Sequence, residues 1–302
     1  MAKTPERCND VTRLREVIHH LNTLGEIREI MNAMKNLAII ESRKLDRVLE
    51  SQRVIVTDID NMAADFTDHY PFDVSFATDH HLYILIGAER GFSGSFNHQL
   101  QQHYRALLQQ SPETKAVTIA IGRKFATTFT AASPTPVLLD GASAQEEISH
   151  VLNQLVSQIE TIQHQYGALP CTVLRHDQLN RGILAQPLLP PFQQPPTTHI
   201  PAPYPPLLYL SPPQFLSELI QQYLFAHLYS ALSASLLAEN EFRVAHLEGA
   251  IRHLDERSVE LGRLRRSLRQ EEIIEEIEVI LLNAGAGDLD SGNGEPTLTD
   301  DA

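Results

Sequence analysis

The sequence is poor in cysteine, in basic residues and in long apolar runs, and each shortage excludes a class of protein. Cys8 and Cys171 are the only two cysteines, so neither a disulfide scaffold nor a cysteine zinc site is available, and we expect reduced cytosolic thiols. The net charge of -14 argues against a general nucleic-acid binder. No segment resembles a signal peptide or approaches the roughly 18 apolar residues of a spanning helix. We therefore expect contact with a membrane only through partners.

Two long segments carry helical patterns at the two ends of the chain. The segment from about Val11 to about Met62 has no proline and one glycine, and its apolar residues recur every three or four positions. The segment from about Pro213 to about Leu282 carries leucines seven residues apart, at Leu247, Leu254, Leu261 and Leu268. The alternatives are a leucine-zipper dimer and pairing within the chain, which we favour because a second striped helix is present. Such helix-rich ends also account for the 6% aromatic content and the absence of tryptophan.

The pattern between these helices changes to that of an α/β domain. Short buried strands are predicted at His81–Gly87 and Ala116–Ile121, with a helix at Phe96–Leu108 between them. This order predicts a right-handed crossover and a parallel sheet, and thus a central Rossmann-like α/β domain. A further helix is predicted at Ala144–Tyr166 and a further strand at Leu169–Leu174.

Proline marks the exit from this domain. Twelve of the 18 prolines lie between Pro170 and Pro213, which predicts an extended connector with an edge strand near Leu207–Leu210, or a docking site for a partner with an aromatic groove. After Leu282 the chain is rich in Gly, Asp and Ser and lacks basic residues, as in a disordered tail. We expect four parts: the first helix in 1–62, the α/β domain with its connector in 63–212, the second helix in 213–284 and an acidic tail in 285–302.

A glycine-rich loop, Gly87–Asn97, is the main candidate for chemistry. It follows a strand and opens a helix, where a phosphate would bind, but it matches neither the dinucleotide fingerprint nor the P-loop. A tight turn with Ser93 near the helix cap is the better interpretation. The 14 histidines show no metal-ligand spacing, and no motif pairs a nucleophile with a base. The sequence therefore predicts no catalytic residues, cofactor or metal.

Charge is unevenly distributed along the second helix. A basic cluster, Arg257 to Arg269, is followed by an acidic cluster, Glu271 to Glu278. Such runs are typical of solvated helix faces, and the basic patches of a long hairpin also suit contact with the acidic loops of a large partner.

Three stretches in order resemble one family. Residues 22–38, with Met31-Asn-Ala-Met-Lys-Asn-Leu-Ala38, resemble its "NT..I..AMK.VA" segment, and Glu89–Asn97 is similar to its "DRGLCGGLN" turn. Glu239–Arg243, followed by Arg265 and Glu271–Glu275, resembles "SEQ..R" and "RQ..IT.E..E". The chain thus resembles the gamma subunit of F-type ATP synthases, in a divergent bacterial form, over about residues 11 to 285.

The resemblance implies a mechanical role without catalysis or bound nucleotide. The terminal helices would form an antiparallel coiled coil, the axle inside a ring of alpha and beta subunits, with the α/β domain at the foot against the epsilon subunit and the membrane c-ring. Met34, Lys35, Arg265 and Glu272 would meet the beta subunits, and Arg90, Gly91 and Gly94 would shape the foot. It also implies a peripheral position on the cytoplasmic face of the bacterial inner membrane.

Several positions depart from the family pattern. Glu89, Ser93 and Ser95 replace Asp, Cys and Gly in the turn, and Arg269 and Gln270 replace Ile and Thr in the last helix. The rival hypotheses are a nucleotide-binding α/β enzyme with helical extensions, resting on Gly87–Asn97, and a coiled-coil scaffold that self-associates through Leu247 to Leu268.

Overall fold

The computed structural model describes residues 4–72, 76, 79–111, 113–129, 135–177, 182–193 and 203–289, and for residues 4–12 and 282–289 only the backbone. The chain divides into two compact units. Unit 1 comprises Met1–Ala33 and Gly249–Ala302, and unit 2 comprises Met34–Glu248. Each is described by itself.

The two predicted long helices are present and longer than predicted. Helix α1 spans Thr4–His69 and helix α5 spans Pro212–Leu289. The extension of α1 beyond Met62 follows from packing, because Ala63, Ala64 and Phe66 are buried. Helix α5 continues to Leu289, so residues 285–289 of the predicted tail are helical, and residues 290–302 lie outside the described residues.

A five-stranded sheet forms the middle of unit 2. Its strands are β1 (His80–Ile86), β2 (Lys115–Ile121), β3 (Val137–Leu139), β4 (Cys171–His176) and β5 (Ile183–Leu189), in the order β3-β2-β1-β4-β5. Strand β1 pairs in parallel with β2 and β4, which confirms the predicted crossover, and β5 pairs antiparallel with β4. The last five residues of β1 and the last four of β2 are buried, because helices lie on both faces of the sheet.

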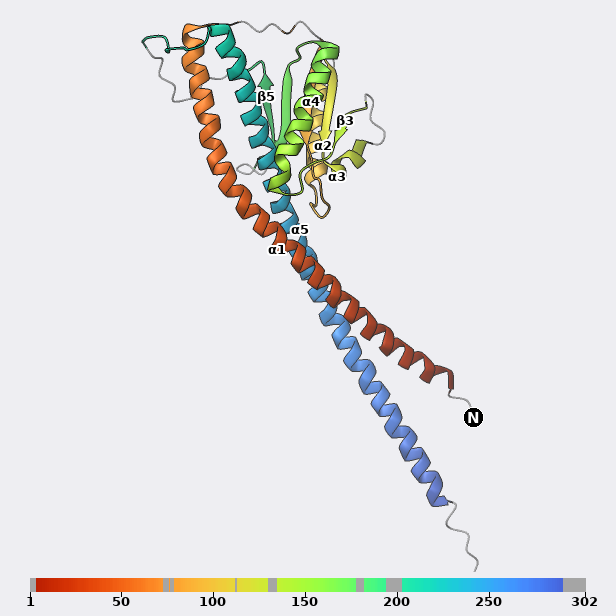
Figure 1. Cartoon of the computed structure of the whole chain (residues 1–302). Helices are drawn as coiled ribbons and strands as arrows, with labels where there is room; N and C mark the ends of the chain where they lie inside the picture. The colour runs from red at the N-terminus through yellow and green to blue at the C-terminus, as the bar shows by residue number, and fades with distance from the viewer. Residues whose placement is uncertain are drawn as a thin grey trace, which may run out of the picture. The chain divides into compact units, whose positions relative to one another are not determined.

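Alternate side chains of β1 point to opposite faces of the sheet and pack against different helices. Leu82, Ile84 and Ile86 belong to a core that includes residues of α4 (Ile148–Tyr166) and α5. Tyr83 and Leu85 belong to a second core on the opposite face. That face is covered by α2 (Phe96–Gln110), α3 (Arg123–Ala126) and the short 3-10 helix Thr127–Phe129, while a second 3-10 helix, Gln145–Glu147, precedes α4. Figure 1 shows α4 and α2 on either side of the sheet.

Within unit 2, α1 and α5 run antiparallel. His227 Nε2 lies 3.0 Å from Asp60 Oδ1, and Lys35 Nζ lies 3.8 Å from Glu248 Oε1, so the partner number falls as the α1 number rises. Residues 231–240 of α5 are all buried, because α1 covers one side of this stretch and the sheet covers another. The predicted pairing within the chain is therefore confirmed for this unit.

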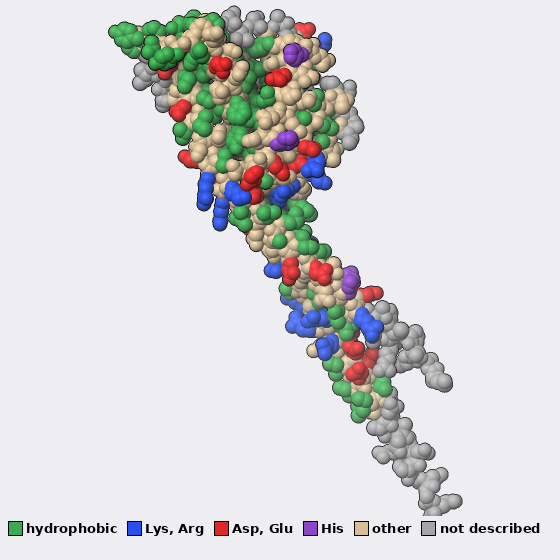
Figure 2. Space-filling view, in the orientation of Figure 1, with side chains coloured by type: hydrophobic (Ala, Val, Ile, Leu, Met, Phe, Trp, Pro, Cys, Tyr) green, Lys and Arg blue, Asp and Glu red, His purple; other side chains and the backbone are tan. Residues whose placement is uncertain are grey.

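The predicted edge strand at Leu207–Leu210 is wrong. The described segment 203–211 has no strand, and Leu207 and Tyr209 are 86% and 97% exposed. Paired prolines precede it and α5 begins directly after it, so no neighbouring strand is available to it. The edge strand in this proline-rich part of the chain is β5, which lies earlier and contains Pro187. Figure 2 shows apolar side chains gathered around segment 203–211. Residues 194–202 of the connector lie outside the described residues.

In unit 1, the segments of α1 and α5 are joined by an ion pair between Arg28 Nε and Asp255 Oδ1, 2.6 Å apart. Val17 and Leu268 are buried in this unit. Among the described residues of the whole chain, no helix has a stretch both long and apolar enough to cross a bilayer.

Candidate functional site

The glycine-rich loop is a tight turn between β1 and α2. Gly94 has φ +57° and Phe92 has φ +63°, the left-handed region that strains most side chains. A Cβ at Gly87 would lie 2.2 Å from the ring of Phe125, so only glycine lets the chain leave β1 there. The turn lies at the carboxyl ends of β1 and β4, where parallel sheets of this order usually bind their ligands.

A carboxylate of helix α5 fills this position instead. Glu239 accepts hydrogen bonds from the backbone N–H of Glu89 (3.0 Å) and of Arg90 (3.1 Å). Arg243, one helical turn later, forms an ion pair with Glu239 and donates from Nε to the Gly91 carbonyl at 3.2 Å. We call this set, Glu239 and Arg243 with the backbone of Glu89 to Gly91, the turn clamp.

The turn clamp is buried, and burial dominates its electrostatics. Desolvation raises the pKa of the Glu239 carboxyl, while Arg243 and the two backbone amides oppose that rise. Desolvation likewise lowers the pKa of the Arg243 guanidinium, opposed by Glu239. Each charge is thus tolerated inside the protein because the other is present.

Glu89 ties the same turn to the segments that follow the neighbouring strands β2 and β3. Its buried carboxylate accepts hydrogen bonds from the backbone N–H of Arg123 (2.9 Å) and of Gly141 (2.8 Å), and it pairs with the exposed Arg123 guanidinium. The turn is therefore fixed on both sides, by α5 and by the segments that follow β2 and β3.

These contacts use the amides that a phosphate would need. Beyond the two amides bound by Glu239, the N–H of Ala88 donates to Asn97 Oδ1 at 2.9 Å, and the N–H of Phe96 donates to the Ser93 carbonyl. The residue at the cap of α2 is Ser95, which makes no side-chain cap bond. The geometry therefore does not favour a nucleotide at this loop.

His176 packs beside the turn clamp. Its ring stacks on Phe96, with centroids 3.9 Å apart, and lies 5.0 Å from the ring of Phe242. Nε2 donates a hydrogen bond to the Phe96 carbonyl at 2.9 Å. Burial lowers the pKa of His176, so the neutral ring is the stable form.

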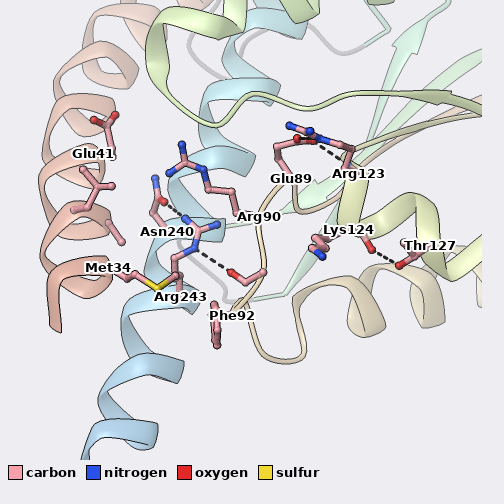
Figure 3. Close-up of a pocket in the computed structure, with 13 residues that line it drawn as sticks. Met34, Glu41, Glu89, Arg90, Phe92, Arg123, Lys124, Thr127, Asn240 and Arg243 are labelled. Carbon is pink, nitrogen blue, oxygen red and sulfur yellow. Dashed lines mark hydrogen bonds and ion pairs between the residues drawn. The ribbon is translucent and has the colours of Figure 1, made fainter. Parts of the chain in front are cut away.

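A cavity of about 650 Å³ opens next to the turn clamp, as Figure 3 shows. We call it the turn cavity. Helix α1, the turn, the α3 region and α5 each contribute to its wall. Helix α1 contributes three apolar residues and one carboxylate, and the four basic side chains come from the other elements. The lining residues are Met34, Leu37, Ala38, Glu41, Glu89, Arg90, Gly91, Phe92, Arg123, Lys124, Thr127, Asn240 and Arg243.

The structure brings together three of the predicted site residues at this cavity: Met34, Arg90 and Gly91. Gly94 lies in the same turn, with the ring of His246 3.5 Å from the position of an added Cβ, and Lys35 pairs with Glu248. Arg265 and Glu272 belong to unit 1, where Arg265 is exposed and Glu272 half-buried.

Sequence reasoning did not single out Glu239, Asn240 and Arg243 as site residues. A signal was present, because Glu239 and Arg243 are four residues apart and therefore on one helix face, next to the apolar stretch that ends at Ala238. The partners of Glu239, however, lie about 150 residues away in the sequence. Among the described residues, no three His, Cys, Asp or Glu side chains form a metal-binding group.

The fold and the site together define a class of protein. Two long helices carry an α/β domain, and a buried polar clamp occupies the position where related sheets bind a ligand. A family model described as ATP synthase matches residues 13–286. The chain belongs to this family, the gamma subunit family of ATP synthase.

Solved structures with the same fold come from mitochondrial ATP synthases. A chain from the Euglena gracilis OSCP/F1/c-ring structure is 15% identical, with a TM-score of 0.59, and the match covers 96% of this chain and 99% of that one. A chain from the Tetrahymena thermophila central stalk/c-ring structure is 16% identical, with a TM-score of 0.54, covering 73% and 99%. A search of curated protein sequences finds no match.

Proposed function

We propose that the chain is the non-catalytic central-stalk subunit of an ATP synthase. It couples ion flow through the membrane sector to ATP synthesis or hydrolysis on the beta subunits by rotating. The observation that carries this proposal is the family match, which extends over both long helices and the α/β domain. Solved chains of similar fold belong to F1, rotor and c-ring assemblies.

The turn clamp supports a mechanical role. A stalk must transmit torque between its helices and the domain at its foot without slipping. Glu239 and Arg243 join α5 to the turn through two backbone amides, one carbonyl and one buried ion pair. Such bonds are strongest where water is excluded, so they resist torsion at the junction.

The partners that we propose are the alpha and beta subunits of F1, the epsilon subunit and the c-ring. Met34 and Lys35 on α1, and Arg265 and Glu272 on α5, would contact the beta subunits. Arg90, Gly91 and Gly94 would shape the foot, and the exposed apolar side chains of segment 203–211 offer a surface for one of these partners.

We place the protein at the periphery of the cytoplasmic face of the bacterial inner membrane, held there by partners. Cell fractionation tests this location. The chain should sediment with membranes and leave them in a low-salt wash together with the alpha and beta subunits. Retention in the membrane after the other F1 subunits have left would contradict the proposed mode of attachment.

Reconstitution tests the function. The purified chain alone should not hydrolyse ATP, and alpha and beta subunits should give a coupled complex with membrane sectors only when the chain is added. ATP hydrolysis by the chain alone, or full coupling without it, would refute the proposal. Calorimetric titration with ATP and NAD addresses the rival, a nucleotide-binding α/β enzyme, which requires saturable binding.

A further inference from the structure

The turn cavity has the size and lining of a small-molecule site. Its volume of about 650 Å³ lies within the range of about 300–1,000 Å³ that ligand pockets occupy. Met34, Leu37 and Phe92 give it an apolar side, and polar and charged side chains line the rest of the wall. Ligand sites usually combine an apolar wall with a few polar groups that orient the ligand.

Two buried polar atoms at this cavity lack a partner among the described residues. They are Nδ2 of Asn240, a donor, and Oε2 of Glu41, an acceptor. Asn240 is 2% exposed and Glu41 is 8% exposed. Burying a polar atom without a hydrogen bond is unfavourable because its lost hydration is not replaced, so both atoms favour an occupant that accepts one bond and donates another.

Four basic and two acidic side chains line the cavity, and this excess of positive charge favours an anion. The guanidinium of Arg243 is bound to Glu239, Asn240 and Gly91, and that of Arg123 is bound to Glu89. Among the described residues, the side chains of Arg90 and Lys124 show no such hydrogen bond or ion pair. Figure 3 shows Arg90 extending from the turn toward α1, next to Asn240.

We propose that the turn cavity binds a small amphipathic carboxylate that carries an N–H donor, such as an N-acylated apolar amino acid. The carboxylate accepts from Arg90 and from Asn240 Nδ2, and the N–H donates to Glu41 Oε2. The apolar group lies on Met34, Leu37 and Phe92. This site shares part of its wall with the turn clamp, through Glu89, Gly91 and Arg243, and its test does not depend on the rotor function.

Calorimetric titration of the full chain with N-acetyl-L-phenylalanine tests this site. We expect saturable binding of one molecule per chain. N-acetyl-L-phenylalaninamide, which has the same shape without the charge, should bind at least about tenfold more weakly, because the charge-assisted bonds to Arg90 are lost. Equal binding of the two probes, or no saturable binding of the acid, would overturn the proposal.

Two variants separate the cavity from the rest of the surface. Arg90→Gln should weaken binding of the acid at least about tenfold and leave binding of the amide unchanged. Arg105→Gln, at an exposed arginine of α2, should change neither. Circular dichroism confirms that both variants fold, and equal effects of the two substitutions would contradict the proposal.

The same titration on the assembled complex distinguishes a ligand from a partner subunit. Binding that persists in the complex supports a small-molecule site. Binding that occurs in the free chain and disappears on assembly would mean that a partner fills the turn cavity, and would overturn the proposal for the working complex.

Discussion

Glu239 stands where an open α/β sheet ordinarily receives its ligand. The carboxyl ends of β1 and β4 flank the switch point of the sheet, and the backbone amides there commonly bind a phosphate. Here two of those amides bind a carboxylate of the chain's own last helix. The position that binds a ligand in other sheets here joins α5 to the turn, and Arg243 balances the charge of Glu239.

Removing one member of the ion pair should be costly at this joint. We expect Glu239→Ala and Arg243→Ala each to lower the free energy of unfolding by about 3–5 kcal/mol, because each leaves a buried charge without its partner. The double variant should cost clearly less than the sum. Urea unfolding followed by circular dichroism measures all three values.

A matched control for this double-mutant cycle is Arg252→Ala, at an exposed arginine of the same helix. We expect it to change the free energy of unfolding by less than about 0.5 kcal/mol. Strictly additive losses for Glu239 and Arg243 would show that the pair does not act as a unit.

His176 should make stability depend on pH. Burial lowers its pKa in the folded chain, so as the pH falls below about 6.5 the unfolded chain takes up a proton first. The free energy of unfolding should therefore fall with pH in that window, by at most about 1.4 kcal/mol per pH unit for one proton.

His176→Phe keeps an aromatic ring between Phe96 and Phe242 and removes the titrating group. Its unfolding free energy should depend less on pH than that of the wild type between about pH 6.5 and pH 5. His98→Gln, at an exposed histidine of α2, serves as the control. Identical pH slopes for the wild type and His176→Phe would contradict this account.

At the scale of elements, α5 changes character along its length. Residues 231–240 are surrounded by protein and mostly small or apolar, whereas the following part buries one stripe, with Leu247 and Leu268 buried and Leu254 and Leu261 half-buried. The heptad leucines of the sequence therefore mark a real packing face, but not a uniform one.

The unequal burial of these leucines predicts unequal costs of truncation. Leu247 is 0% exposed, so Leu247→Ala should lower the free energy of unfolding by about 2–5 kcal/mol. Leu264 on the same helix is 39% exposed, and Leu264→Ala should cost less than about 0.5 kcal/mol. Denaturant unfolding of the two variants measures both losses of unfolding free energy. Similar losses would mean that burial does not determine the cost of truncating these leucines.

The elements also show what the sequence could and could not predict. Strands β1 and β2 were predictable because both are continuous apolar runs. Strand β5 was not, because Pro187 hides it within a proline-rich region, while the apolar Leu207–Leu210 resembles a strand but has no neighbour to pair with. The role of Glu239 was also not predictable, because local patterns do not reveal contacts about 150 residues apart.

At the scale of the whole molecule, Met34 connects the helices to the proposed rotary function. Its side chain lines the turn cavity and extends toward Arg243, as Figure 3 shows. Met34→Lys would add a cation near Arg90, Arg243 and Lys124 on a half-buried position. Because lysine can extend its charge into water, we expect the chain to fold and assemble.

Coupling should suffer more than folding in this variant. ATP-driven ion pumping by the assembled complex should fall several-fold relative to its ATP hydrolysis, because the added charge would disturb the proposed contacts with the beta subunits. Met34→Leu, which conserves volume, should pump normally. Unchanged pumping in Met34→Lys would refute the proposed contact.

The two edge strands of the sheet affect how the chain behaves before it assembles with its partners. One border is β3, only three residues long, and the other is β5, which contains a proline that cannot donate to a neighbouring strand. Neither offers a long template for another chain. These two edge strands should therefore keep copies of the unassembled chain from aggregating through strand pairing.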